Sequence, residues 1–222
     1  MKIGLSLSLI IIFGFNAKAQ VPVSQEPRHH IVFENSRVRI LNVVLPPGDT
    51  SQYHIHSTPS VFIGLTTTPI GSQLIHQDPR PGNFTSGSVF FENLNAPHNR
   101  IHRVWNMDSS VFHVIDIELL SKDSGFNQEP FHEKYVRLET DTPWVRIYKI
   151  ELPGNEQLSI HEDKRTFIVV ALSDSKIDVA KNNQKIATIL SAGNFFWLPP
   201  GDKLNLANTL RSTAALALME IQ

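Results

Sequence analysis

Apolar residues in this chain come in short runs separated by turn residues, not in long helical stripes. Each run holds four to nine residues, is rich in Val, Ile or Phe, and is bounded by Gly, Pro, Asn or Asp. A helix would need an apolar period of about 3.6 residues over ten or more positions, and we find none after residue 19. The pattern predicts strands at residues 31–34, 38–45, 52–56, 61–67, 88–91, 101–105 and 111–119.

The same pattern starts again after a polar, turn-rich stretch at residues 121–130. Matching residues in the two halves are separated by 102 to 107 positions throughout, which indicates an internal duplication. The matches are Val38-Arg39-Ile40 with Val145-Arg146-Ile147, Leu45 with Leu152, His56 with His161, Gly87 with Gly193, Asn106 with Asn208, and Glu118 with Glu220.

Composition supports an all-β protein of two small domains. The 222 residues are 41% hydrophobic and 18% charged, an ordinary balance for a globular core. A net charge of −1 argues against nucleic acid and acidic membranes as partners. With no cysteine, stability must come from packing without disulfides. We expect a first domain at 20–125 and a second at 126–222.

The first nineteen residues differ from the rest. Lys2 gives a charged start, residues 3–15 are an apolar run, and Ala17-Lys18-Ala19 places small residues where a signal peptidase reads. The run is too short for the roughly twenty residues that a transmembrane helix needs. We interpret residues 1–19 as a cleaved signal peptide, which predicts a secreted or periplasmic protein with no membrane anchor after cleavage.

Three histidines form the candidate chemical site. His54 and His56 stand two apart on a predicted strand, so both project from the same face. That spacing lets two imidazoles converge on one ion at about 2.0 to 2.1 Å. His102, on a later strand, is the natural third ligand. Neutral imidazole suits Fe, Mn, Zn, Cu or Ni and does not choose among them.

These residues resemble the two motifs of the cupin superfamily, and the duplication resembles a bicupin. Gly48, His54 and His56 fit the first motif; Pro97, His102 and Asn106 fit the second, with Asn99 in a glycine position. The resemblance implies two tandem antiparallel jelly-roll barrels, with pairing into a homodimer through their sheets. Because cupins include many enzymes and also non-enzymes, it selects no reaction.

The family's glutamate is missing, since Ser60 or Val61 stands in its place. Three imidazoles plus water would then resemble the three-histidine iron centres of some dioxygenases, with two or three open positions for substrate or dioxygen. For substrate contacts we name Gln52 on the histidine face, Ser60, and Arg100 in the turn before His102. No catalytic side chain is assigned.

Most of the remaining histidines carry no predicted chemistry. His29 and His30 have no partner at ligand spacing and are interpreted as surface or satisfied polar positions. His161 is interpreted as the remnant of His56, because its partners in the repeat are Ser159 and Leu204. We therefore expect a structural second domain, packing on its twin to cover exposed sheet edges.

Two classes of function remain open. The first is a metal-dependent, dioxygenase-like enzyme that acts on a small oxygenated organic molecule. The second is a non-catalytic cupin that binds a small ligand or a partner protein, with or without metal. A structural relic, in which both sites have decayed, is a third hypothesis, and it predicts neither metal nor ligand binding.

Overall fold

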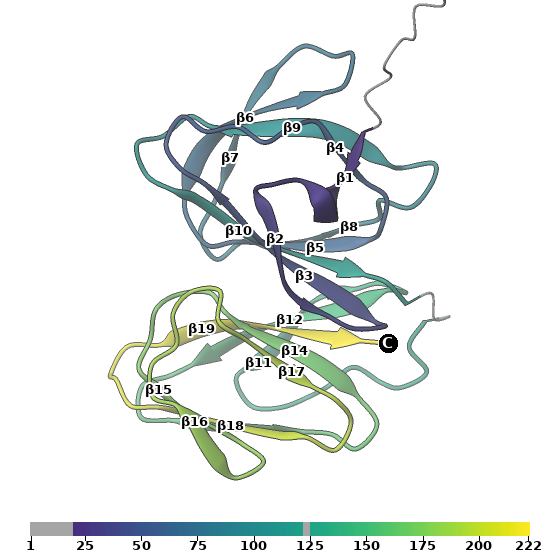
Figure 1. Ribbon diagram of the computed structural model, residues 1–222. Helices are drawn as coiled ribbons and strands as arrows, with labels where there is room; N and C mark the ends of the chain where they lie inside the picture. Colours follow the sequence, from purple (N-terminus) through teal and green to yellow (C-terminus); the bar gives the residue numbers. More distant parts are fainter. Residues whose placement is uncertain (1–19, 122–124) are drawn as a thin grey trace, which may run out of the picture.

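The computed structural model describes residues 20–121 and 125–222, and nearly all regular structure in them is β-strand (Figure 1). The one helical element among these residues is a 3₁₀ turn, η1 (Val23–Gln25). The prediction of an all-β protein is confirmed. Residues 1–19, interpreted as a signal peptide, lie outside the described residues. No helix in the described part is long and apolar enough to cross a membrane.

The first half, residues 20–121, consists of two five-stranded sheets that face each other. The site sheet has the order β1-β4-β9-β6-β7, and the middle sheet has the order β2-β3-β10-β5-β8. Their strands are β1 (Val21–Pro22), β2 (His29–Glu34), β3 (Val38–Leu45), β4 (His54–His56), β5 (Ser60–Gly64), β6 (Thr68–Leu74), β7 (Arg80–Phe84), β8 (Val89–Glu92), β9 (Arg100–Asn106) and β10 (Phe112–Leu119).

The second half, residues 125–222, repeats this plan. A five-stranded sheet with the order β11-β12-β19-β14-β17 faces a four-stranded sheet with the order β13-β18-β15-β16. The strands are β11 (Val136–Asp141), β12 (Val145–Leu152), β13 (Gln157–His161), β14 (Thr166–Ala171), β15 (Ile177–Lys181), β16 (Gln184–Ala187), β17 (Phe195–Leu198), β18 (Lys203–Asn208) and β19 (Ala214–Ile221). The expected domain boundary at residue 125 falls between β10 and β11 and stays a prediction.

The sheets do not close into the barrels that we expected. In the first half, the site sheet ends at β1 and β7, and no ladder of hydrogen bonds joins it to the middle sheet among the described residues. Both edge strands contain a proline, Pro22 and Pro81. Proline has no N–H to donate to a further strand. Each half is therefore a pair of opposed sheets, similar to a jelly roll but open.

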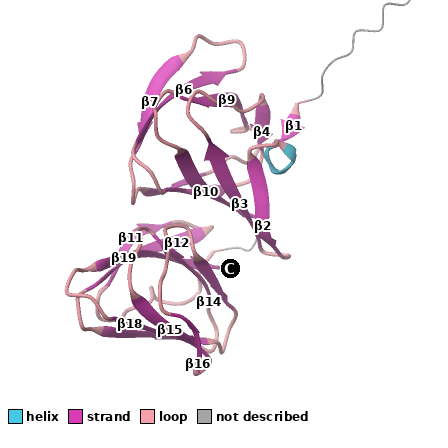
Figure 2. Cartoon of the chain, turned by 60° about the vertical axis from the view of Figure 1, so that its left-hand side comes forward, coloured by secondary structure: helices cyan, strands magenta, loops and turns pink. Residues whose placement is uncertain are grey.

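The two halves pack through sheet faces, not through the edges that we expected the second half to cover. The middle sheet lies on the β11-β12-β19-β14-β17 sheet (Figures 1 and 2). On β10, Ile115 and Ile117 point toward the second half and join a cluster with Ile147 and Met219. The inner strands of this sheet are covered on both faces, since every residue of β5 and seven of the eight residues of β10 are buried.

Strand prediction succeeds where the apolar pattern is strong and fails where glycine and proline interrupt it. Strand β3 was predicted at residues 38–45 and is found there. The β6–β7 hairpin was missed, because Pro69, Gly71 and Pro81 hide its alternation. Gly71 has a packing reason: a Cβ there would collide with the indole of Trp105 on the neighbouring strand β9.

Candidate metal centre

The two motifs bring His54, His56 and His102 together at one place in the first half. His54 and His56 lie on β4, are 1% and 3% exposed, and line a cavity between the site sheet and the middle sheet. Strand β9 pairs antiparallel with β4, and the register sets His102 directly opposite His54. Residues directly opposite in such a pair project from the same face. The expected convergence of the three rings is therefore found.

The distances between the ring nitrogens match those around a single ion. The Nε2 atom of His56 lies 3.1 Å from Nε2 of His54 and 3.1 Å from Nε2 of His102. Two nitrogens bound to one metal at about 2.1 Å, with bond angles between tetrahedral and octahedral, are separated by about 3.0 to 3.4 Å. Both separations from His56 therefore lie in the range expected for two ligands of a first-row divalent ion.

The protonation of His54 can be inferred from its second nitrogen. Its Nδ1 lies 2.9 Å from the backbone carbonyl of Gln52, and a carbonyl can only accept a hydrogen bond. The proton of the neutral ring therefore sits on Nδ1, and Nε2 presents a lone pair to the other two rings. This Nε2 lone pair can accept either an N–H donor or a metal ion, so the tautomer of His54 is the one that metal binding requires.

Burial keeps these imidazoles in the neutral form that binds metal. Desolvation, with repulsion from neighbouring cationic groups, lowers the pKa of His54 to about 4 and that of His102 to about 2. The pKa of His56 is held well below its usual value by the same causes. At neutral pH all three rings are unprotonated, so a metal ion does not have to displace a proton from them.

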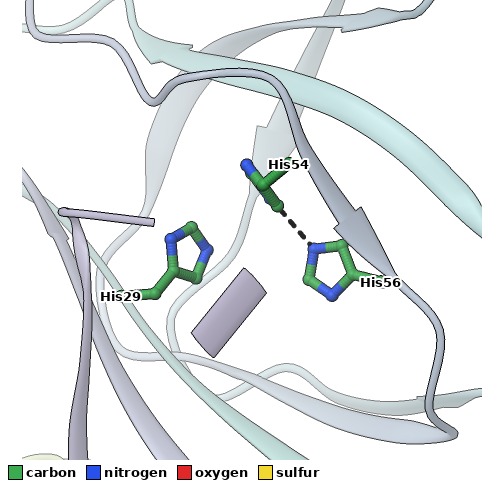
Figure 3. A group of neighbouring side chains, drawn as sticks. All are labelled: His29, His54 and His56. Carbon is green, nitrogen blue, oxygen red and sulfur yellow. Dashed lines mark hydrogen bonds between the residues drawn. The ribbon is translucent and has the colours of Figure 1, made fainter. Parts of the chain in front are cut away.

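A fourth histidine, His29, lies in the same cluster (Figure 3). It is a satisfied polar position, bonded to Glu26, but it is buried, and our inference that it has no partner at ligand spacing is wrong. One ring nitrogen from each of His29, His54 and His56 lies within 4.8 Å of the others. The His29 ring is buried, with its centroid 4.6 Å from that of His54 and 6.2 Å from that of His56. Nothing in the spacing of the sequence indicates this, because the pairing of β2 with β3 sets its position.

Two carboxylates lie next to the cluster. Glu26 accepts a 2.6 Å hydrogen bond from Nδ1 of His29. Burial raises the pKa of Glu26, but hydrogen bonds from His29 and from backbone N–H groups outweigh it and hold that pKa below its usual value. On the middle sheet, Asp116 is fully buried, with Oδ2 3.5 Å from Nδ1 of His56. Neither the Asp116 carboxylate nor Nδ1 of His56 has a hydrogen-bond partner among the described residues, and burial raises the pKa of Asp116 well above its usual value.

The predicted substrate-contacting residues occupy different surroundings. Arg100 lines the cavity and is paired with Glu92, its Nη2 donating to Oε1 at 2.9 Å. Ser60 is fully buried at the start of β5, and its hydroxyl donates to the carbonyl of Thr58. Gln52 has an exposed side chain that is not among the described residues lining the cavity; only its backbone supports His54.

The histidines stand at one wall of a largely apolar cavity of about 420 Å³. Phe62 and Phe90 stack on each other at 5.4 Å between ring centroids, and the His56 ring contacts Phe62 edge-on. Phe84 and Phe112 extend the aromatic wall. All the lining residues belong to the first half, so the second half does not close this cavity. Such a space fits a small organic molecule beside a metal.

Comparison of the sequence with known proteins finds no match, either to a protein-family model or to a curated protein. Comparison of the structure finds clear similarity to solved structures. AerE from Microcystis aeruginosa is 13% identical with a TM-score of 0.59, covering 89% of this chain and 98% of that one. YhhW from Escherichia coli is 13% identical with a TM-score of 0.57, covering 89% of each chain.

A third similar structure is salicylate 1,2-dioxygenase from Pseudoaminobacter salicylatoxidans, in adducts with gentisate. It is 10% identical with a TM-score of 0.61, covering 86% of this chain and 70% of that one. At such identities the similarity concerns the fold alone. These neighbours are cupin-fold proteins, and with its two matching halves and its histidine cluster the chain has a duplicated cupin fold.

Proposed function

We propose that this protein is an exported, metal-dependent, dioxygenase-like enzyme that acts on a small oxygenated organic molecule. The observation that carries the proposal is the convergence of three histidine nitrogens, 3.1 Å apart in successive pairs, at the wall of an apolar cavity. The similarity in fold to a salicylate 1,2-dioxygenase supports it. The centre would hold Fe, Mn, Zn, Cu or Ni, bound by His54, His56 and His102.

The residues of the chain account for binding and orientation. The phenylalanines of the cavity would bind a flat apolar body and exclude water from it. Arg100, held by Glu92 on the neighbouring sheet, would place a positive charge beside the polar end of the ligand. A bound metal would supply open coordination positions for oxygen atoms of the substrate or for dioxygen.

Export is part of the proposal because of the first nineteen residues. Their charged start, apolar run and Ala17-Lys18-Ala19 ending are typical of a signal peptide. An exported protein meets the metals of the periplasm or the medium, so the metal content after export is the informative quantity. Mass spectrometry of the secreted or periplasmic protein, with N-terminal sequencing, measures both points.

The metal centre is tested with His54→Ala and His102→Ala. We expect about one equivalent of a transition metal in the unaltered protein and a loss in both variants, because a site with two imidazoles binds far more weakly. His161→Ala is the matched control, since this exposed histidine lies on β13 of the second half. Oxygen consumption with small phenolic acids then tests the reaction. Metal-free protein, or metal that persists in both variants, contradicts the proposal.

A second candidate function, binding without catalysis, is favoured by the apolar character of the cavity. Four phenylalanines line it, and they do not depend on a metal. A binder of this kind predicts that small aromatic compounds raise the melting temperature in the presence of a chelator, with no consumption of oxygen.

A further inference from the structure

The N-terminal segment, residues 20–29, reaches into the metal centre from outside both sequence motifs. Strand β1 pairs in parallel with β4, the strand of His54 and His56, with Val21 opposite His54. The turn η1 follows, and Val23 within it is buried in the core of the first half. The chain then enters β2 at His29. This path fixes both ends of the segment, one on the site sheet and one on the middle sheet.

Glu26 is the polar anchor of this segment. It is 2% exposed and accepts hydrogen bonds from three groups. Its Oε1 accepts from the backbone N–H of Gln52 at 3.0 Å, which ties it to the chain just before β4. Its Oε2 accepts from the backbone N–H of Arg28 at 2.7 Å and from Nδ1 of His29 at 2.6 Å. A buried carboxylate with this many donors is held rigidly in one position.

The bond to Glu26 determines which nitrogen of His29 is available. Because the carboxylate accepts from Nδ1, the neutral ring carries its proton there, and Nε2 is left with a lone pair. The His29 ring packs against His54 and His56, the two rings against which His102 also packs. His29 and His102 thus flank the same pair of rings.

The ligand distances are compatible with a fourth bond. The ring nitrogens of His29, His54 and His56 fall within 4.8 Å of one another, and two nitrogens on opposite sides of one ion are separated by about 4.2 Å. A shift of several tenths of an ångström closes that difference for these three rings; His102 lies outside this group, so a fourth bond requires His29 and His102 to close on the ion together. Ser60 stands where the cupin motif has its glutamate, and its hydroxyl donates to the backbone carbonyl of Thr58.

We propose that His29 is a fourth nitrogen ligand of the metal and that Glu26 is its positioning residue, together replacing the missing glutamate of the cupin motif. The inference rests on the proposed metal centre at His54, His56 and His102. Four imidazoles leave two open positions on a six-coordinate ion. That number fits one bidentate oxygen ligand, or one monodentate ligand with dioxygen. Glu26 accepts a hydrogen bond from Nδ1 of His29, the nitrogen that would not bind the metal. A carboxylate in that place strengthens histidine as a metal ligand.

The test uses Zn²⁺ and Cu²⁺ as probes on the purified full chain, with His29→Ala, Glu26→Gln and the control His30→Ala. His30 is the neighbouring exposed histidine on β2. Competition with a chromophoric chelator should show Zn²⁺ affinity reduced about 10-fold in Glu26→Gln, more strongly in His29→Ala, and unchanged in His30→Ala. Paramagnetic resonance of the Cu²⁺ form should show coupling to four nitrogens, falling to three in His29→Ala alone.

The outcomes separate this inference from the function on which it rests. If His54→Ala abolishes binding while His29→Ala behaves as His30→Ala does in both measurements, the fourth ligand is wrong and the three-histidine centre stands. If the unaltered protein binds neither ion, both are wrong. The melting temperatures of the metal-free variants show whether the fold is retained, and His29→Gln, which keeps more of the side-chain volume, replaces His29→Ala if it is not.

Discussion

The two halves of this chain have the same frame, meaning the same arrangement of strands, but different interiors. Strands β3 and β12 occupy matching eight-residue segments. In the first half the amide of Asn106 donates to the carbonyl of Leu45 at 3.0 Å, and in the second the amide of Asn208 donates to that of Leu152 at 3.0 Å. These bonds tie corresponding strands together in both halves. The residues that maintain the frame have therefore been kept in both copies.

The interiors differ at the strand that carries the histidines. On β4 the inward positions are His54 and His56, whereas on β13 they are Leu158 and Ile160. Our interpretation of His161 as the remnant of His56 is wrong in register, because its side chain is 47% exposed. A shift of one residue moves a side chain to the other face of a sheet. The alignment by sequence was off by that one residue.

The difference shows what a binding site requires of this fold. In the second half, apolar residues from both sheets fill the interior as one cluster. In the first half, four histidines and the fully buried Asp116 stand around a cavity of about 420 Å³. Polar groups and empty space both reduce stability. The second half and its apolar contact with the middle sheet supply packing that the first half lacks.

The strongest test of this comparison places histidines in the second interior. Leu158→His combined with Ile160→His should lower the free energy of unfolding by about 3 to 5 kcal/mol, because it buries two imidazoles with no ligand or partner. Denaturant unfolding monitored by tryptophan fluorescence measures it. Ser159→His, on the exposed face of the same strand, is the control and should change stability by less than about 0.5 kcal/mol. Equal effects would mean that Leu158 and Ile160 do not face the interior.

Acidification should act on the first half. The folded-state pKa values of His54 and His102 lie near 4 and 2, below the ordinary 6.5, so the unfolded chain binds more protons below pH 6.5. The contribution of these two histidines to the stability of the metal-free protein is therefore complete above pH 6.5 and falls toward pH 4, by about 3 kcal/mol in total at pH 5.5. Asp116, whose pKa is raised, acts in the opposite direction but is one group against three. Melting temperatures from pH 7.5 to 5 measure the net effect. A melting temperature that stays constant or rises on acidification contradicts it.

The shared frame predicts equal effects from Asn106→Ala and Asn208→Ala. Each change removes two hydrogen bonds from an amide to backbone carbonyls and should cost about 1 to 2 kcal/mol. Asn205→Ala on β18 serves as the control, because its side chain is only half-buried. Chemical denaturation of the three variants measures the costs. A several-fold difference between Asn106→Ala and Asn208→Ala would show that the two asparagines do not have the same role.

The smallest effect on stability is expected from the reverse exchange. His54→Leu combined with His56→Ile gives the first half the side-chain types of the second. Binding of metal should be lost, yet the free energy of unfolding without metal should change by less than about 1 kcal/mol, because buried polar groups are exchanged for apolar ones of similar size. Unfolding in the presence of a chelator measures it. A loss of several kcal/mol would show that the histidines also stabilise the fold by themselves.

The sequence by itself determined the all-β class, the repeat and the three motif histidines. Alternation along β3 and the spacing of His54 and His56 can be recognised in the sequence, because each depends on the residues of a single strand. The recurrence at about 105 residues needed no structure either. The similarity to cupins followed from these residues.

Only the tertiary structure decided which other groups join the site. His29 reaches the centre because β2 pairs with β3 and β1 pairs with β4, and Asp116 faces it because β10 lies in the middle of the opposite sheet. These contacts join residues far apart in the chain, at spacings with no characteristic pattern. The one-residue register of β13 was likewise set by packing, since the side chains that fill the second interior select which face turns inward.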